Sequence, residues 1–136
     1  MSRPTSFEDL PLVMTVAEVA DLLQVSKAII YQLVRGEQLR KLQVGKQIRI
    51  LRSDLQAYLT GGVPYPECDP GFAQVPLLLT VQDMMPLLKL GRNSVLELVH
   101  SEQIRCVRVS CQIRVLKYEL QEFLLGGKES DRNDLV

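Results

Sequence analysis

The side chains with the clearest potential for chemistry in this chain lie between Ser26 and Ile50, where basic and amide residues follow two different repeats. From Lys27 to Arg35 they recur every three or four residues, which places them on one side of a helix. Further on, polar and apolar residues alternate, as they do in a strand. Cationic groups bind phosphates, and amide and guanidinium groups hydrogen-bond base edges. The chemistry indicated is therefore non-covalent recognition of a nucleic acid.

Residues for bond-making chemistry are missing from this pattern. The chain has one histidine, His100, and three cysteines, Cys68, Cys106 and Cys111, which lack the clustered spacing of a zinc site. We find no nucleophile beside a partner base and no phosphate-binding loop, so the sequence does not predict an enzyme. No metal or cofactor is expected, and the cysteines are expected to be reduced thiols.

The overall composition is that of a folded protein without net charge. Of the 136 residues, 46% are hydrophobic, which is enough to form packed cores. The 16 basic and 16 acidic residues cancel, which argues mildly against a DNA partner, although a small basic face can lie on a neutral protein. Residues 1–13 lack a signal-peptide pattern, and no apolar run approaches the ~20 residues of a membrane span. We expect a bacterial-type cytoplasmic, nucleoid-associated protein that makes no membrane contact.

The elements that must position these residues occur twice. Residues 11–62 align without a gap on residues 76–127, and 21 of the 52 positions are identical. Each copy is therefore expected to be one structural unit. Residues 63–75 include three prolines and a glycine, which predicts an extended, semi-rigid linker. Residues 1–10 are left as an N-terminal segment and residues 128–136 as a polar tail.

Each unit is expected to begin with two short helices. In the first unit, Thr15 and Glu18 have the spacing of a capping box. Ser26 is the expected N-cap of the second helix, and Gly36 is expected to end it in a left-handed conformation. The face of the second helix predicted to be buried consists of Ile29, Ile30, Leu33 and Val34, and the opposite face consists of Lys27, Ala28, Tyr31, Gln32 and Arg35. Two helices separated by about three residues form a helix-turn-helix.

A hairpin, or wing, and a closing helix complete the unit. The turn is expected at Gly45–Lys46, where a positive φ suits glycine. Leu42, Val44, Ile48 and Ile50 are expected on one side of the hairpin, and Gln43, Gln47 and Arg49 on the other. Ser53 or Asp54 is the expected cap of the closing helix, whose apolar residues are Leu55, Tyr58 and Leu59. The predicted fold is mainly α with small β-hairpin wings, an α+β class made of tandem winged helix-turn-helix domains.

The motifs of the first unit match those of a known family. The matching positions are Thr15, Glu18, Ala20, Leu23, Ser26, Tyr31, Arg35–Gly36, Leu39, Val44–Gly45, Arg49–Ile50 and Asp54–Leu55. Through them the unit resembles the excisionase-type branch of the MerR-like winged helix-turn-helix superfamily. The resemblance implies that the second helix enters the major groove of DNA while the wing lies along the neighbouring backbone or minor groove. Effector-sensing relatives carry a coiled coil or a ligand domain after this unit, and none follows here, so no small-molecule effector is expected.

The side-chain chemistry then assigns DNA contacts to both elements. The candidates are Ser26, Lys27, Ala28, Tyr31, Gln32 and Arg35 on the helix, and Gln43, Lys46, Gln47 and Arg49 in the wing. Gln32 can bond an adenine edge, Arg35 a guanine or a phosphate, and Ala28 can approach a thymine methyl. The main-chain N–H groups after Ser26, together with Lys46 and Arg49, can bind phosphates. A solvated helix face beside an ordinary surface hairpin is the open alternative.

The second unit keeps the scaffold and changes the surface. Pro86 is expected to shorten or kink its first helix. Ser101 stands where the first unit has Gly36, and Ser110–Cys111 replace Gly45–Lys46, so the wing tip is expected to lose its easy turn geometry and its charge. On the groove-facing stripe, Asn93, Leu96, Glu97 and His100 replace Ala28, Tyr31, Gln32 and Arg35. The candidate contacts that remain are Arg92, Asn93, Arg108 and Arg114. This unit is expected to be a weaker reader, a reader of other bases, or a docking surface.

Together these features predict a sequence-specific double-stranded DNA-binding protein whose tandem units bind two nearby half-sites. Its role would be that of an excisionase-like architectural factor or a small transcriptional regulator. A recombinase or another protein is a candidate partner of the second unit. The alternative is a protein–protein adaptor in which the second unit, or both, has lost DNA binding.

Overall fold

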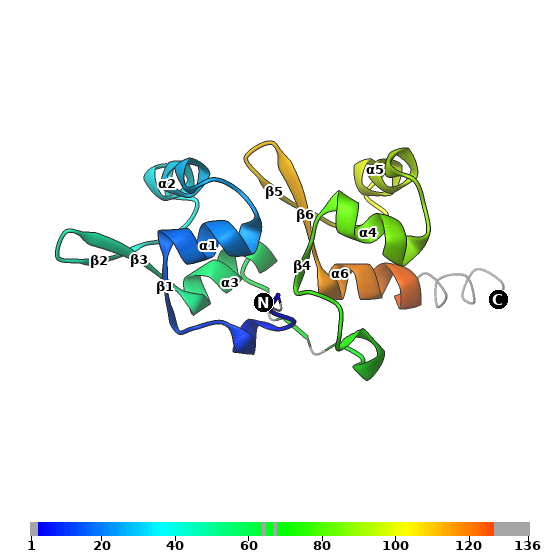
Figure 1. Ribbon diagram of the computed structural model, residues 1–136, viewed down its shortest axis with the longest axis horizontal. Helices are drawn as coiled ribbons and strands as arrows, with labels where there is room; N and C mark the ends of the chain where they lie inside the picture. The colour runs from blue at the N-terminus through cyan, green and yellow to red at the C-terminus, as the bar shows by residue number, and fades with distance from the viewer. Residues whose placement is uncertain (1–2, 64, 67, 127–136) are drawn as a thin grey trace. The chain divides into compact units, whose positions relative to one another are not determined.

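Six α-helices and two three-stranded sheets make up the part of the chain that the computed structural model describes, which is residues 3–63, 65–66 and 68–126. The fold class is α+β. The chain divides into two units, Met1–Tyr65 and Pro66–Val136 (Figure 1). The predicted polar tail, residues 128–136, lies outside the described residues.

Unit 1 consists of a 3-10 helix, a short strand, two helices, a hairpin and a closing helix, in that order. Its elements are the 3-10 helix η1 (Phe7–Asp9), β1 (Val13–Thr15), α1 (Val16–Leu23), α2 (Lys27–Arg35), β2 (Leu42–Val44), β3 (Gln47–Leu51) and α3 (Arg52–Thr60). The sheet order is β1-β3-β2, and both pairings are antiparallel. The hairpin of β2 and β3, called the wing below, projects from the body of the unit (Figure 1).

Unit 2 repeats this order. Its elements are the 3-10 helix η2 (Pro70–Phe72), β4 (Leu78–Leu79), α4 (Val81–Leu88), α5 (Arg92–His100), β5 (Val107–Val109), β6 (Gln112–Leu116), α6 (Lys117–Gln121) and a π-helical turn, Glu122–Gly126. The sheet order is β4-β6-β5, which is the order of unit 1 with each strand replaced by its counterpart.

The internal repeat is a repeat of the hydrophobic core. One cluster of unit 2 consists of the buried residues Leu79, Val81, Met84, Val95, Val99, Ile104, Val115 and Leu120. Shifted back by 65 positions, these are Met14, Val16, Val19, Ile30, Val34, Leu39, Ile50 and Leu55, and all eight are buried in unit 1. Each copy therefore encloses its own core, with the same positions facing inward.

The segment before the first repeat belongs to unit 1. Phe7 and Leu10 are buried, and the ring of Phe7 meets that of Tyr65 edge to face, with centroids 4.9 Å apart. The Arg52 guanidinium donates to the Leu10 carbonyl at 2.9 Å. Residues 63–75 are also more than an extended linker, because Pro70–Phe72 form a 3-10 helix and the Asp69 N–H donates to the Gln121 side chain at 2.7 Å. A proline-rich composition signals restricted backbone freedom, which short 3-10 turns satisfy as well as extended chain does.

The predicted start of the first helix is confirmed, and the predicted end of the second is one residue off. Thr15 and Glu18 form both hydrogen bonds of a capping box, at 3.1 and 3.0 Å. Gly36 follows α2 with a φ of −82°, and the left-handed residue is Glu37, with a φ of 60°. A side chain at Gly36 would lie 3.3 Å from the Gln32 carbonyl, and the equivalent position of unit 2 holds Ser101 with nearly the same φ, −84°. Glycine is therefore not required at this position.

The predicted sides of the wing are wrong. Leu42 pairs with Arg49, Gln43 with Ile48, and Val44 with Gln47. Residues directly opposite each other in an antiparallel pair point to the same face, so Arg49 and Gln47 share a face with Leu42 and Val44. Across a two-residue turn, an even-numbered residue of one strand pairs with an odd-numbered residue of the other. The alternation therefore cannot be continued across the turn as if the chain were one strand.

The closing helix begins without the predicted cap. The structure starts α3 at Arg52, with Leu51 as N-cap and no side-chain cap, instead of at Ser53 or Asp54. The Arg52 N–H donates to the Leu12 carbonyl at 2.9 Å, so the sheet already satisfies a donor that a serine or aspartate would otherwise serve. Leu55 and Leu59 are buried as predicted. Tyr58 is half-buried, its hydroxyl has no partner among the described residues, and burial raises its pKa.

A shortened first helix and a lost wing-tip turn, both expected for unit 2, are absent. Pro86 lies inside α4, yet α4 has eight residues, as α1 has. Pro86 is exposed and lies near the end of a short helix, so the cost is limited to one lost hydrogen bond near the surface. The wing tip keeps its turn because Ser110 takes the left-handed conformation of Gly45, with φ values of 61° and 62°. A serine pays a steric cost there that a glycine does not.

Candidate nucleic-acid interface

The predicted recognition face of α2 is exposed along its whole length. Lys27, Ala28, Tyr31, Gln32 and Arg35 are all exposed, whereas Ile30, Leu33 and Val34 on the opposite side are buried and Ile29 is half-buried. The buried side chains hold the helix against the core, which fixes its rotation. Ser26 caps the helix as predicted, and its hydroxyl accepts from the Ile29 N–H at 3.4 Å. Its role in the structure is thus to define the start of α2.

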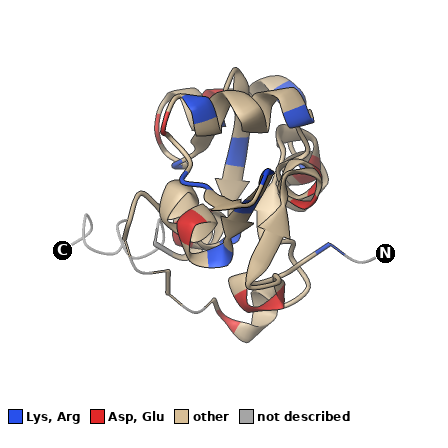
Figure 2. Ribbon diagram, turned by 90° about the vertical axis from the view of Figure 1, so that its left-hand side faces the viewer, with Lys and Arg blue, Asp and Glu red and all other residues tan. Residues whose placement is uncertain are grey.

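A hollow of about 480 Å³ joins α2 to the wing. It is lined by Thr15, Val16, Ala17, Lys27, Tyr31, Lys46, Gln47, Ile48 and Arg49, and is called the Lys46 hollow below. Five of the residues that the sequence singled out thus surround one space, although they come from a helix and a hairpin. Three of them, Lys27, Lys46 and Arg49, are cationic. Basic residues (blue) are visible on the helix at the top of Figure 2 and on strands beneath it.

Arg49 is held in place by its own strand. Its guanidinium donates to the Ile48 carbonyl at 2.9 Å and to the side-chain oxygen of Gln47. A guanidinium has five N–H donors, so these two bonds leave others for a phosphate. Gln47 therefore positions Arg49 and still has its own amide N–H groups for a ligand.

Gln43 does not reach this hollow. It lies opposite Ile48, on the other face of the wing from Gln47 and Arg49, and unlike Ile48 it is not among the residues that line the hollow. Its side-chain amide donates to the Gly45 carbonyl at 3.0 Å, which braces the turn. The structure thus assigns Gln43 to the wing tip, and its counterpart Arg108 lies exposed on β5, opposite Ile113.

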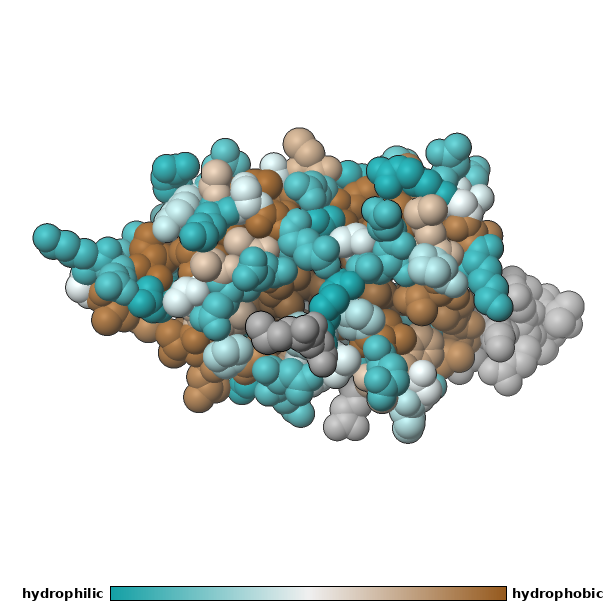
Figure 3. Space-filling model, viewed as in Figure 1, coloured by the Kyte–Doolittle hydropathy of each residue, from teal (hydrophilic) through white to brown (hydrophobic). Residues whose placement is uncertain are grey.

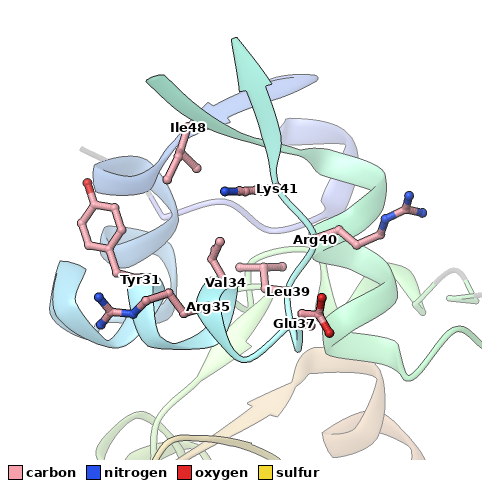
Figure 4. Close-up of a pocket in the computed structure, with 8 residues that line it drawn as sticks. All are labelled: Tyr31, Val34, Arg35, Glu37, Leu39, Arg40, Lys41 and Ile48. Carbon is pink, nitrogen blue, oxygen red and sulfur yellow. The ribbon is translucent and has the colours of Figure 1, made fainter. Parts of the chain in front are cut away.

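A second hollow, of about 590 Å³, lies beside the C-terminal half of α2 (Figure 4). It is lined by Tyr31, Val34, Arg35, Glu37, Leu39, Arg40, Lys41 and Ile48, and is called the Lys41 hollow below. Tyr31 and Ile48 border both hollows. Sequence reasoning missed Arg40 and Lys41, because they lie between a helix and a strand, where no periodicity shows which way a side chain points.

The corresponding surface of unit 2 has fewer cations. Arg92 and Asn93 are exposed at the start of α5. Arg114 is bonded as Arg49 is, to the Ile113 carbonyl and the Gln112 side chain, both at 2.7 Å, but only 7% of its surface is exposed. Cys111 takes the place of Lys46 at the wing tip, and Cys106 that of Lys41. The repeat therefore conserves the scaffold more closely than the charge.

Comparison with known proteins decides what unit 1 is. A family model described as a helix-turn-helix domain matches residues 13–62. Residues 13–62 are a helix-turn-helix domain. The match extends from β1 to the end of α3, so this helix-turn-helix domain includes both the α1–α2 pair and the wing. A domain of this kind indicates DNA binding. No curated protein and no solved structure gave a significant match to the chain.

The described residues offer few groups for metal binding or for thiol chemistry. Cys68, Cys106 and Cys111 form no disulfide with one another in the part of the chain that the structure describes. Within residues 3–63, 65–66 and 68–126, no three side chains of His, Cys, Asp or Glu lie together so as to hold a metal ion. No helix in the same part of the chain has the length and apolar character that crossing a bilayer requires.

Proposed function

We propose that the protein binds double-stranded DNA sequence-specifically, with the helix-turn-helix domain of unit 1 as its main reader. The observation behind this proposal is the Lys46 hollow, around which the exposed face of α2 and the wing together present Lys27, Lys46 and Arg49. A helix of this size fits the major groove, and a hairpin beside it reaches the adjoining backbone. The neutral net charge is compatible with this, because three cations lie together around this one hollow.

Base reading and backbone binding fall to different sides of α2. Ala28, Gln32 and Arg35 follow one another at intervals of four and three residues, which makes them one stripe. They are exposed and, apart from Arg35, border neither hollow. We assign Gln32 to an adenine edge, Ala28 to a thymine methyl and Arg35 to a guanine or a phosphate. Lys27, Lys46 and Arg49 bind phosphates and set the register.

Unit 2 is proposed to be a second, weaker winged helix-turn-helix reader. Its element order and core repeat those of unit 1, and Arg92, Asn93 and Arg108 stay exposed. One unit of this size buries little DNA, and a tethered second unit adds affinity by raising its own effective concentration at a neighbouring half-site. The role that fits this arrangement is an excisionase-like architectural factor or a small transcriptional regulator.

The second candidate function is a protein–protein adaptor. It is favoured by apolar side chains on the face of the unit 1 sheet that also carries Gln47 and Arg49, where Val13, Leu42 and Val44 are 46%, 39% and 55% exposed. Figure 3 shows apolar surface (brown) beside the hairpin at the left of the view. In unit 2, the carboxylate Glu97 lies on the exposed stripe of α5 and would repel a phosphate. These features suit a protein partner more than DNA.

Selection of bound sequences from a random duplex library with the full chain tests the choice. We expect one enriched motif, with an affinity that falls steeply as salt rises because phosphate contacts release counterions. Gln32→Ala should relax the preference at one base pair of that motif, by a few-fold to about 100-fold. Gln38→Ala, an exposed glutamine off the stripe, should leave the motif unchanged. Enrichment of no sequence, with a flat salt dependence, would favour the adaptor.

Arg49 and Arg114, which occupy equivalent positions in the two units, should contribute unequally to DNA affinity. Arg49→Ala is expected to weaken binding to all sequences, by about tenfold, because it removes a charge-assisted phosphate contact. Arg114→Ala should cost less than threefold by the same estimate, because Arg114 is 7% exposed in the structure. Gel-shift titration of both variants against one duplex measures the ratio. Equal losses would mean that unit 2 binds DNA as strongly as unit 1.

A further inference from the structure

The Lys41 hollow contains charge that the helix-turn-helix contacts described above do not use. In Figure 4 the Lys41 side chain points across the hollow toward Tyr31, and Arg35 extends along the same side of α2. Arg40, the preceding residue, also belongs to the lining, but its side chain points away to the opposite side (Figure 4). Lys41 and Arg40 are thus neighbours in sequence with the same charge but different directions.

The cations of this hollow lack protein partners in the described part of the chain. No ion pair joins Arg35 or Lys41 to an acidic residue there, although Glu37 is part of the lining. The apolar floor, formed by Val34, Leu39 and Ile48, provides no acceptor side chain. An ammonium group that has no internal acceptor and faces an open space is available for an external anion.

The two hollows follow one another along the same side of α2. Lys27, Tyr31 and Arg35 recur at intervals of four residues, so they form one row, with Lys27 at the Lys46 hollow and Arg35 at the Lys41 hollow. A helix that lies in the major groove has a sugar–phosphate strand running beside it. At ~1.5 Å per residue, the nine residues of α2 cover a stretch of that strand with several phosphates.

We propose that the Lys41 hollow is a second phosphate site of unit 1, in which Lys41, assisted by Arg35, binds a phosphodiester group of the strand that also passes the Lys46 hollow. The proposal rests on the proposed DNA-binding function and extends it to a site that belongs to unit 1 alone. In unit 2 the corresponding positions are Cys106 and His100, so the charge of this site is absent there. Unit 1 thereby binds one DNA strand at two points, with Tyr31 between them.

The test compares Lys41→Gln with Arg40→Gln in the full chain. Both remove one positive charge from an exposed side chain in the same loop, so they have the same effect on net charge and little effect on stability. Fluorescence anisotropy with a short labelled duplex carrying the selected motif measures affinity over a salt series. Lys41→Gln should weaken binding about tenfold and lower the slope of log affinity against log salt by about 0.9, whereas Arg40→Gln should change affinity less than threefold.

A scan with methylphosphonate, which neutralises one phosphate at a time, locates the contact. Neutralising the contacted phosphate should weaken binding by the wild-type chain but not by Lys41→Gln. This phosphate should lie on the same DNA strand as the phosphate whose neutralisation no longer weakens binding by Lys46→Ala. Equal losses for Lys41→Gln and Arg40→Gln, or a Lys41-sensitive phosphate on the other strand, would overturn the proposal. Failure of the wild-type chain to bind any duplex would instead reject the DNA-binding function itself.

Discussion

Alanine at both Lys27 and Lys46 is expected to lower the affinity of the full chain for duplex DNA by about 100-fold. These two side chains reach the Lys46 hollow from different elements, α2 and the wing tip. Each substitution removes a charge-assisted contact to phosphate, which typically lowers affinity by about tenfold. The slope of log affinity against log salt should also fall by about 1.8, because two fewer counterions are released. A salt series with one duplex measures both effects.

The matched control removes two positive charges elsewhere. Arg40→Ala with Arg105→Ala gives the same change in net charge, at equivalent exposed positions of the two units, neither of which lines the Lys46 hollow. Binding should fall only a few-fold by the same estimate. If the control loses as much affinity as Lys27→Ala/Lys46→Ala, then general attraction drives binding and the hollow is not a site.

Ile30→Ala should unfold unit 1 in the absence of DNA and abolish binding. Ile30 is 0% exposed and belongs to the side of α2 that faces the core. Truncating a buried isoleucine to alanine costs about 2–5 kcal/mol of unfolding free energy, and a unit of this size has only about 3–5 kcal/mol to lose. Hydrogen exchange resolved by peptide, in the full chain, should show lost protection in unit 1 and retained protection in α5.

Ile29→Ala is the control for this result, because it makes the same chemical change one position earlier on a half-buried side chain. It should cost about 1 kcal/mol and leave DNA binding nearly intact. Similar protection in the two variants would show that α2 is rotated relative to the description above, which would also remove its recognition face.

The internal repeat shows how far a single sequence determines such a fold. Burial tolerates exchange among apolar residues of similar size but not their replacement by polar ones, so core positions leave a pattern in the chain. Val19 and Met84, or Ile30 and Val95, differ in type and share a buried position. The face of α2 and the capping box at Thr15 could be predicted for the same reason, because helix spacing and local hydrogen bonds act within a few residues.

Details that depend on contacts between distant segments could not be predicted in this way. Arg52 starts α3 because its N–H meets the Leu12 carbonyl, a residue 40 positions away in the chain. The pairing of Leu42 with Arg49 depends on where the turn closes, and a change of one residue moves every wing side chain to the other face. Ser110 keeps a left-handed turn without glycine because the paired strands on both sides hold it there.

The sequence by itself determined the two units, their order of helices and strands, the positions of the cores and the exposed row from Lys27 to Arg35. These follow from hydrophobic burial and helix geometry, which are local or periodic along the chain. Only the tertiary structure decided that the wing tip meets this row around one hollow, that Gln43 is not part of its lining, and that the Lys41 side chain points across a second hollow while that of Arg40 points away. Directions in turns and loops are set by cross-strand register and by packing against other elements, which leave no period in the sequence.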